Sequence, residues 1–466
     1  MSSIKDDFHD LQIKHWKSMY TATLKQEVGK PNNKITEPDQ DSKPLIRKVS
    51  KMLRDNKNME KYYEPRAVSI GLLHHGRDKF SLAEGHKLKL AELFITENGI
   101  DEFGLRSKIK TKIEGLKQCY PANDVMRVNI NDESLASMFL IDGFALLHYI
   151  CYASLGKLND LKKIGMDVEA FSQDLFFLEN QIPYEVLDDI MISATKGGAN
   201  MRNLIDKFIN QTVRDIRGSS LTSPSPTSTS TSTSISPQQQ QPPPAHLLQL
   251  LRYRLVGDHD HHETGEKTKT GKRVGRVNDL KSAGIHLKSG REGSLRDNVS
   301  FASHWITGTL TLPCIVFNDS TTPKLLNLIA FEMCPDFQND SQVITSYIFF
   351  LNSLIHQVED ITELRKAHVL IINNNNDNAV AGSDEEVARL FKEIGSSVLD
   401  SVPEAYLEVK ELIQKHCEKK WKSWTAYAFN NRFSGPWTLF AFAAATALLV
   451  ISFSSRLGTP LNLSAK

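Results

Sequence analysis

The residues of this chain most suggestive of chemistry are Glu179, Asn180 and Gln181, a carboxylate and two amides inside the apolar run FFLENQIPYEVLDDI. A general acid at Glu179 would need a second titrating group close by, and the adjacent residues supply none. The alternative interpretation is structural. Asp174 would cap a helix that ends near Gln181, and a second helix would begin at about Pro183, because proline is tolerated at the first helical position. The three polar side chains would then supply partners for backbone groups left unpaired at the break.

His74, His75 and Gly76 form a second candidate, as metal ligands or as a catalytic base. Two adjacent histidines on one chain rarely both reach one ion, and no cysteine or carboxylate lies at ligand spacing, so the pattern favours a structural role. Glu332 lies within the apolar run IAFEMC and would be costly to bury unpaired. We therefore expect Glu332 to form a salt bridge or a backbone hydrogen bond.

Two polar stretches imitate ligand sites. The cluster DHDHH at 258–262 resembles a metal site, but its polar loop context favours adventitious binding. GEKTKTGKR resembles a phosphate-binding loop, yet five residues separate Gly265 from Gly271, and Arg273 replaces the Ser or Thr that would hold magnesium. We therefore expect no catalytic residue, no metal, no cofactor and no identifiable small-molecule substrate. Lys and Arg number 56 against 55 Asp and Glu, a balance that gives no basic field for nucleic acid.

The elements that must position these residues are mainly helical. DESLASMFLIDGFALLHYICYAS is apolar almost all round after a cap at Asp132 or Ser134, which predicts a central buried helix. SDEEVARLFKEIGSSVL sets one apolar face behind a capping box, which predicts a surface helix. Strands are predicted at 308–317, where Pro313 restricts the strand to an edge or a bulge, and at 368–372. The fold class expected is α+β, a predominantly α-helical globular domain with a few short strands and one C-terminal transmembrane helix.

Composition divides the chain into segments. The start is polar, and the stretch GSSLTSPSPTSTSTSTSISPQQQQPPP has too little apolar surface to offset the entropy of ordering it. The expected organisation is a flexible start at 1–44, a first half of the domain at 45–217, a disordered insert at 218–245, a second half at 246–427, a transmembrane anchor at 434–455 and a short tail at 456–466.

The segment from Pro436 to Phe453 has 18 residues without a charge, which at about 1.5 Å per residue approaches the ~30 Å hydrocarbon layer of a bilayer. Lysines cluster before it, and Trp421, Trp424 and Trp437 suit the interfacial aromatic belt. The start lacks a signal peptide, and the five cysteines are scattered. We therefore expect a tail-anchored protein of the plasma membrane with the bulk of the chain in the cytosol. The alternative is a very apolar core helix that packs inside a soluble domain.

Six long motifs carry a family resemblance: YYEPRAVSIGLLHHG, LFFLENQIPYEVL, HLLQLLR, LLNLIAFEMC, ITSYIFFLNSLIHQVEDITELRKAHVL and GSDEEVARLF. Their length and order closely resemble the plant domain-of-unknown-function family 247, also called uncharacterised protein family 0481. The resemblance runs from about Pro44 to the C-terminus and skips the insert. It implies a land-plant, single-pass membrane protein without established catalytic activity. Some grass members are implicated in gametophytic self-incompatibility, which would make the domain a recognition module.

Two classes of function follow from these observations. The favoured one is a non-enzymatic recognition or signalling protein that binds an unknown protein partner at a membrane surface. The other is an enzyme, hydrolase-like or of another kind, with a site built from His74, His75, Glu179 and Glu332. Convergence of these four side chains in one solvent-reachable cleft would favour the enzyme. Separate burial against backbone groups would favour recognition.

Overall fold

The computed structural model describes residues 45–128, 130–196, 198–218, 243–257, 274–290, 294–296, 298–305, 307–335, 342–372, 383–398, 406, 408–419, 444–449 and 451–452. Within these ranges the chain is mostly helical with a few short strands, so the expected globular α+β class is confirmed. The predicted start at 1–44, nearly all of the predicted insert and the two ligand-like polar stretches lie outside the described residues.

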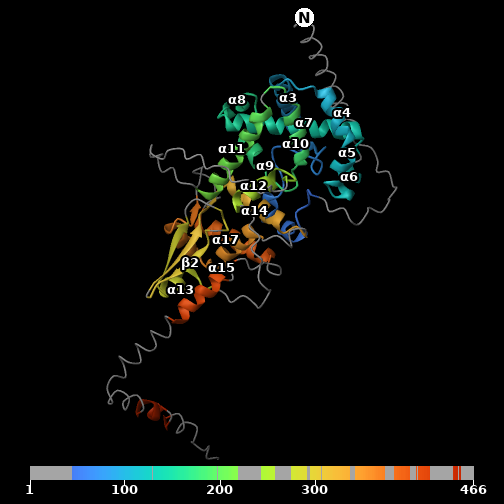
Figure 1. Ribbon diagram of the computed structural model, residues 1–466. Coiled ribbons are helices and arrows are strands. Elements are labelled where there is room, and N and C mark those ends of the chain that lie inside the picture. Colours follow the sequence, from blue (N-terminus) through green and yellow to red (C-terminus); the bar gives the residue numbers. More distant parts are fainter. Residues whose placement is uncertain are drawn as a thin grey trace, which may run out of the picture.

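The first half of the chain is built from helices. They are α2 (Lys51–Arg54), η1 (Glu60–Tyr62), η2 (Asp78–Phe80), α3 (Ser81–Asn98), α4 (Glu102–Thr111), α5 (Ile113–Gln118), α6 (Ala122–Val128), α7 (Asp132–Ser154), α8 (Leu158–Lys163), α9 (Val168–Asp174), α10 (Tyr184–Ser193) and α11 (Gly198–Arg217). Helix α7 packs against α3, α4, α10 and α11, and Figure 1 shows this group at one end of the molecule.

Helix α7 is the central buried helix that its sequence predicts. Among the described helices it is the one that length and composition would allow to cross a membrane, but 94% of its apolar window is buried, as in the core helix of a globular domain. Its N-cap is Asn131, one residue before the predicted Asp132. The Asn131 side chain accepts a hydrogen bond of 2.9 Å from the backbone N–H of Ser134, which removes one unpaired donor from the first turn.

The predicted helix between Asp174 and Gln181 is wrong. Helix α9 ends at Asp174, and the chain runs through turns and extended backbone until α10 begins after Pro183, which confirms the predicted second helix. The Asp174 side chain does not cap a following helix. It accepts hydrogen bonds from the backbone N–H groups of residues 66–68. Tertiary contacts therefore override the helical content of LFFLEN.

The second half contains helices and two small sheets. Its elements are α12 (Leu247–Val256), α13 (Val277–Ser282), β1 (Ile285–Gly290), β2 (Ser300–Ser303), β3 (Gly308–Pro313), β4 (Ile315–Phe317), α14 (Thr321–Glu332), α15 (Val343–Leu354), α16 (Val358–Lys366), β5 (Leu370–Ile372) and α17 (Asp384–Val398). The first sheet has the order β1-β3-β2, with β1 parallel and β2 antiparallel to β3. In the second sheet β4 pairs with β5 in parallel.

The single strand predicted at 308–317 is two strands, and the edge placement is wrong. Strand β3 lies in the middle of the first sheet, and β4 belongs to the second sheet. Pro313 is the last residue of β3. Because β2 pairs only as far as Thr311, proline interrupts no hydrogen bond on that side, and the chain leaves one sheet for the other at this point.

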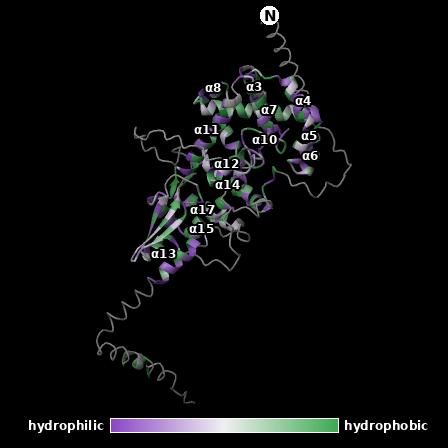
Figure 2. Ribbon diagram, in the orientation of Figure 1, coloured by the Kyte–Doolittle hydropathy of each residue, from purple (hydrophilic) through white to green (hydrophobic). Residues whose placement is uncertain are grey.

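Helix α17 is the predicted surface helix, and the backbone N–H of Glu386 donates to the Ser383 hydroxyl at its start. A further helical stretch covers 408–419, and residues 444–449 and 451–452 are also helical. In Figure 2 this last stretch is coloured as hydrophobic. The described part of the predicted anchor is therefore helical and apolar.

One hydrophobic core runs through both halves of the chain, from Ile46 to Ile413. Helix α11, before the predicted insert, packs on α12, after it, and on α14. In Figure 1 helices α9, α12 and α14 lie between the all-helical end and the end with the sheets. The loop between α9 and α10 is buried at this junction, so its polar residues can reach both halves.

Candidate functional site

Four buried residues, Asp174, Glu179, Asn180 and Gln181, form what we call the polar hub. Asn180 is 1% exposed, and each polar atom of its side chain pairs with backbone. Its Oδ1 accepts from the N–H of Ile70 at 2.7 Å, and its Nδ2 donates to the carbonyls of Val68 (3.1 Å) and Asp174 (2.9 Å). Asn180 therefore holds the extended segment before His74 against the end of α9.

Gln181 connects the hub to the second half of the chain. Its Nε2 donates to the carbonyls of Leu175 (2.8 Å) and Phe177 (2.9 Å), within its own loop. Its Oε1 accepts from the backbone N–H of Leu248 at 3.2 Å, in the first turn of α12. Pro183 then precedes α10 as its N-cap residue. Asn180 and Gln181 thus supply backbone partners at the break, as the sequence predicts.

Asp174 also belongs to the hub, although the sequence gives it a different role. Its carboxylate accepts hydrogen bonds from the backbone N–H groups of Arg66 (3.0 Å), Ala67 (2.6 Å) and Val68 (2.9 Å). Burial raises the pKa of Asp174 to about 6, against the effect of these donors, which favour the charged form. These N–H groups belong to residues about a hundred positions before Asp174. The local sequence therefore could not reveal that they converge on its carboxylate.

Glu179 has a different environment from the two amides. Its Oε1 accepts from the backbone N–H of Val49 at 2.8 Å and from the guanidinium of Arg54. Its Oε2 lies 3.7 Å from His74 Nε2. The carboxylate therefore ties α2 and the segment before it to the hub, and it pairs with a cation instead of standing free as a general acid.

His74 is buried beside Glu179 and is 2% exposed. Neither ring nitrogen makes a hydrogen bond to another described residue, and the ring meets the Phe80 ring edge-on at 6.4 Å. Burial, and then the positive charges of Arg77 and Lys79, lower the pKa of His74 to about 3. A neutral imidazole with so low a pKa is a weak general base near pH 7.

His75 and Gly76 complete the turn after His74. The backbone N–H of His75 donates to the carbonyl of Leu72 at 3.3 Å, and His75 is 8% exposed. Gly76 has a φ of 75°, which a residue with a Cβ rarely adopts. The HHG motif therefore forms a tight turn.

Glu332 forms the predicted salt bridge. Its Oε1 lies 2.9 Å from Arg252 Nε, and both side chains are fully buried. Its Oε2 accepts from the backbone N–H and the hydroxyl of Thr345, each at 2.8 Å, at the start of α15. The pair joins α12, α14 and α15. A negative charge at the N-terminus of α15 is also favourable to the helix dipole.

The four residues of the predicted enzyme site do not form one open cleft. His74 and Glu179 are adjacent, but each is only 2% exposed, and Glu332 is occupied by Arg252. Among the described residues no group of three or more His, Cys, Asp or Glu side chains could hold a metal ion. The arrangement is suited to joining backbone segments.

A second buried ion pair was not predicted. Lys87 Nζ, on α3, lies 2.5 Å from Asp142 Oδ1 on α7 and 2.8 Å from the carbonyl of Ser69. The other Asp142 oxygen accepts from the N–H of Gly71 at 2.7 Å. Asp142 is an acid inside an apolar run, the same signal that singled out Glu332, so the sequence contained the evidence for this site.

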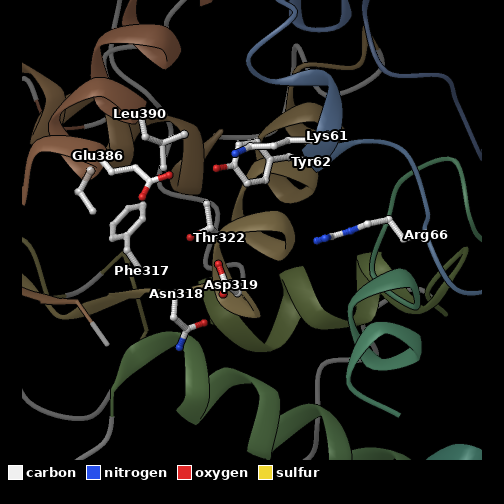
Figure 3. A pocket seen from close by; sticks show the side chains of 10 residues that line it. Lys61, Tyr62, Arg66, Phe317, Asn318, Asp319, Thr322, Glu386 and Leu390 are labelled. Atoms are coloured by element: carbon white, nitrogen blue, oxygen red, sulfur yellow. The ribbon is translucent and has the colours of Figure 1, made fainter. Parts of the chain in front are cut away.

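An open pocket of about 120 Å³ lies near the start of α14 (Figure 3). Its lining residues come from the η1 region, the turn between β4 and α14, and α17: Lys61, Tyr62, Arg66, Phe317, Asn318, Asp319, Thr322, Glu386, Val387 and Leu390. In Figure 3 the side chain of Arg66 approaches from one side and that of Glu386 from the other. The pocket combines both charges with an apolar wall and is suited to a small polar group with both signs of charge.

The sequence of this chain is similar to those of known plant proteins. The chain matches the model of a plant protein family of unknown function, DUF247, over residues 46–451. It is 24% identical over 428 residues to the UPF0481 protein At3g47200 of Arabidopsis thaliana, a match that covers 84% of this chain and 81% of that protein. The putative UPF0481 protein At3g02645 of the same plant is 27% identical over 175 residues, 38% of this chain and 31% of that one. No solved structure matches. The chain therefore belongs to the plant family DUF247, whose function is unknown, as its motifs predict.

Proposed function

We propose that this protein is a membrane-anchored, non-enzymatic recognition module whose segment from Pro436 to Phe453 crosses a bilayer. The observation that carries the proposal is the exposure of the described part of this segment. Leu448, Leu449 and Ile451 are 66%, 69% and 62% exposed, although each would gain about 1.5–3 kcal/mol from full burial. A core helix would bury these side chains against the body, so their exposure favours lipid as their surroundings.

The flanking charges support an orientation with the globular body in the cytosol. Lys410, Lys415 and Lys419 lie on the helical stretch 408–419, and the sequence continues as KWKSW. Clustered lysines are attracted to an anionic cytoplasmic leaflet, with a contribution of about 1 kcal/mol per residue near the surface. We propose the plasma membrane as the location, because a membrane rich in anionic lipid on its cytoplasmic side would attract these lysines.

Recognition is favoured over catalysis by what the hub residues do. The amides of Asn180 and Gln181 pair with backbone groups, Glu179 pairs with Arg54, and His74 is buried and neutral. The described pocket offers instead a surface with charges of both signs. We therefore propose that a protein partner, of unknown identity, contacts the molecule at the pocket.

Flotation with vesicles tests the anchor. Full-length protein translated in the presence of liposomes should float with them after a high-salt wash. The double substitution Ala444→Arg with Leu448→Arg should abolish flotation, because each arginine costs about 2.5–3.5 kcal/mol inside a bilayer. Ala444→Leu is the matched control and should float as the wild type does. If the arginine variant floats equally well, the segment does not cross the bilayer and the proposal is wrong.

A further inference from the structure

Trp305 is the most exposed large apolar side chain in the described part of the molecule, at 97%. It lies on the turn between β2 and β3, which is closed by a 2.8 Å hydrogen bond from the N–H of His304 to the carbonyl of Thr307. At this exposure the ring makes little contact with the sheet. A fully exposed tryptophan is a candidate contact with something outside the chain.

The strand that precedes Trp305 is fastened to the helical stretch 408–419. The Ser303 hydroxyl lies 2.8 Å from His416 Nδ1, and the Phe301 ring meets the His416 ring edge-on at 5.6 Å. His416 is buried, whereas Lys415 and Lys419 of the same stretch are exposed. Trp305 is thus placed next to the last described turns before the anchor segment.

The chain length limits the distance between Lys419 and the start of the proposed membrane span. Pro436 follows Lys419 by about 17 residues, which can reach at most roughly 60 Å when extended and about 25 Å when helical. Figure 1 shows β2 at the same end of the molecule as α13 and the stretch 408–419, and α4 at the opposite end. Within the described ranges, the β2 end has both an exposed tryptophan and lysines that precede the anchor.

Tryptophan and lysine together match one kind of surface. The indole ring is amphipathic and is enriched at the headgroup level of bilayers, and lysines are attracted to anionic lipid phosphates. We propose that Trp305 inserts into the headgroup layer of the membrane crossed by Pro436–Phe453, so that the body lies with its β2 end on an anionic bilayer surface. This inference rests on the proposed function, since the anchor brings the turn to the membrane.

Brominated lipids provide the test. The full-length wild type and Trp305→Phe are reconstituted into phosphatidylcholine and phosphatidylserine vesicles, with bromine atoms at shallow acyl positions. The chain has five tryptophans, so the fluorescence difference between the two proteins isolates Trp305. We expect bromine to quench this difference signal at least twofold and acrylamide to quench it little. Phenylalanine keeps the turn apolar, and circular dichroism checks that the fold is unchanged.

A matched control places the same probe at the far end. Phe103 on α4 is 69% exposed, and Phe103→Trp in the Trp305→Phe chain should be quenched by acrylamide and not by bromine. If the Trp305 signal behaves like this control while the protein stays in carbonate-washed vesicles, the inference is overturned and the anchor stands. Trp305 would then be free for a protein partner. Release of the protein by carbonate would overturn the anchor and this inference together.

Discussion

Replacement of Asn180 by alanine tests the role of the polar hub. The amide of Asn180 makes three hydrogen bonds, one from the N–H of Ile70 and two to the carbonyls of Val68 and Asp174, and it is 1% exposed. Alanine removes all three partners and leaves a small cavity between α9 and the segment before His74. Water has little access to the three stranded backbone groups.

The expected cost follows from these groups. A buried donor or acceptor that loses its partner costs about 1–3 kcal/mol, and an N–H is less easily satisfied elsewhere than a carbonyl with two lone pairs. If the Ile70 N–H bears the full cost and the two carbonyls bear part of it, the loss in the free energy of unfolding is about 3–5 kcal/mol. A loss of this size is a large fraction of the stability of most proteins.

Urea denaturation of the full-length protein in mild detergent, followed by circular dichroism, measures the loss. Asn203→Ala is the matched control, because Asn203 is an exposed asparagine on α11 and its replacement should change stability by less than about 0.5 kcal/mol. A loss below about 1 kcal/mol for Asn180→Ala would refute the reasoning. The Asn180 hydrogen bonds would then contribute little to holding the segment before His74 against the end of α9.

Three further predictions concern single residues. Gly71→Ala should prevent folding or lower the free energy of unfolding by more than about 4 kcal/mol. Gly71 has a φ of 74°, and an added Cβ would lie 2.1 Å from the carbonyl oxygen of Gln181. Gly85→Ala on α3, where an added Cβ would have no described neighbour within 4 Å, should instead stabilise by about 0.5–1 kcal/mol, and thermal unfolding compares the two. Glu332→Ala should cost about 3–5 kcal/mol in urea denaturation, because Arg252 stays buried without its carboxylate; a cost below about 1 kcal/mol would contradict this. The pKa of His74 falls from 6.5 to about 3 on folding, so the unfolded chain takes up this proton first, and His74 should lower stability as the pH falls from 6.5 to 3. The pKa of Asp174 rises from 3.8 to about 6 on folding, so Asp174 should raise stability as the pH falls from 6 to 3.8 and offset part of this loss. His74→Leu should therefore lose less stability than the wild type over this range, or gain stability, and an unchanged pH profile would show that His74 is not the source.

Several features could be predicted because their signals are local. An acid inside an apolar run must be paired, which predicted the salt bridge of Glu332. Proline cannot continue a helix but can begin one, which predicted the start of α10 after Pro183. A long segment without a polar face predicted the buried α7.

Other features could not be predicted because they depend on distant residues. Asn180 and its partner Ile70 are 110 positions apart, and Glu179 and Val49 are 130 apart. These long-range contacts hold 175–183 in turns and extended backbone, so α9 does not continue past Asp174. Likewise, the position of β3 in the middle of its sheet depends on pairing with β1 and β2, which no property of the strand itself discloses. Local periodicity indicates whether a segment is a helix or a strand. It is a weaker guide to which elements that segment will pack against.

Alkaline carbonate extraction of plant microsomes that contain the full-length protein tests the central claim most directly. The carbonate wash opens vesicles and strips proteins held only by charge. If the segment from Pro436 to Phe453 lies among lipid tails, the protein will stay in the pellet with an integral membrane marker. Recovery of the protein in the supernatant, together with a peripheral marker, would contradict the anchor and the recognition role at a membrane that depends on it.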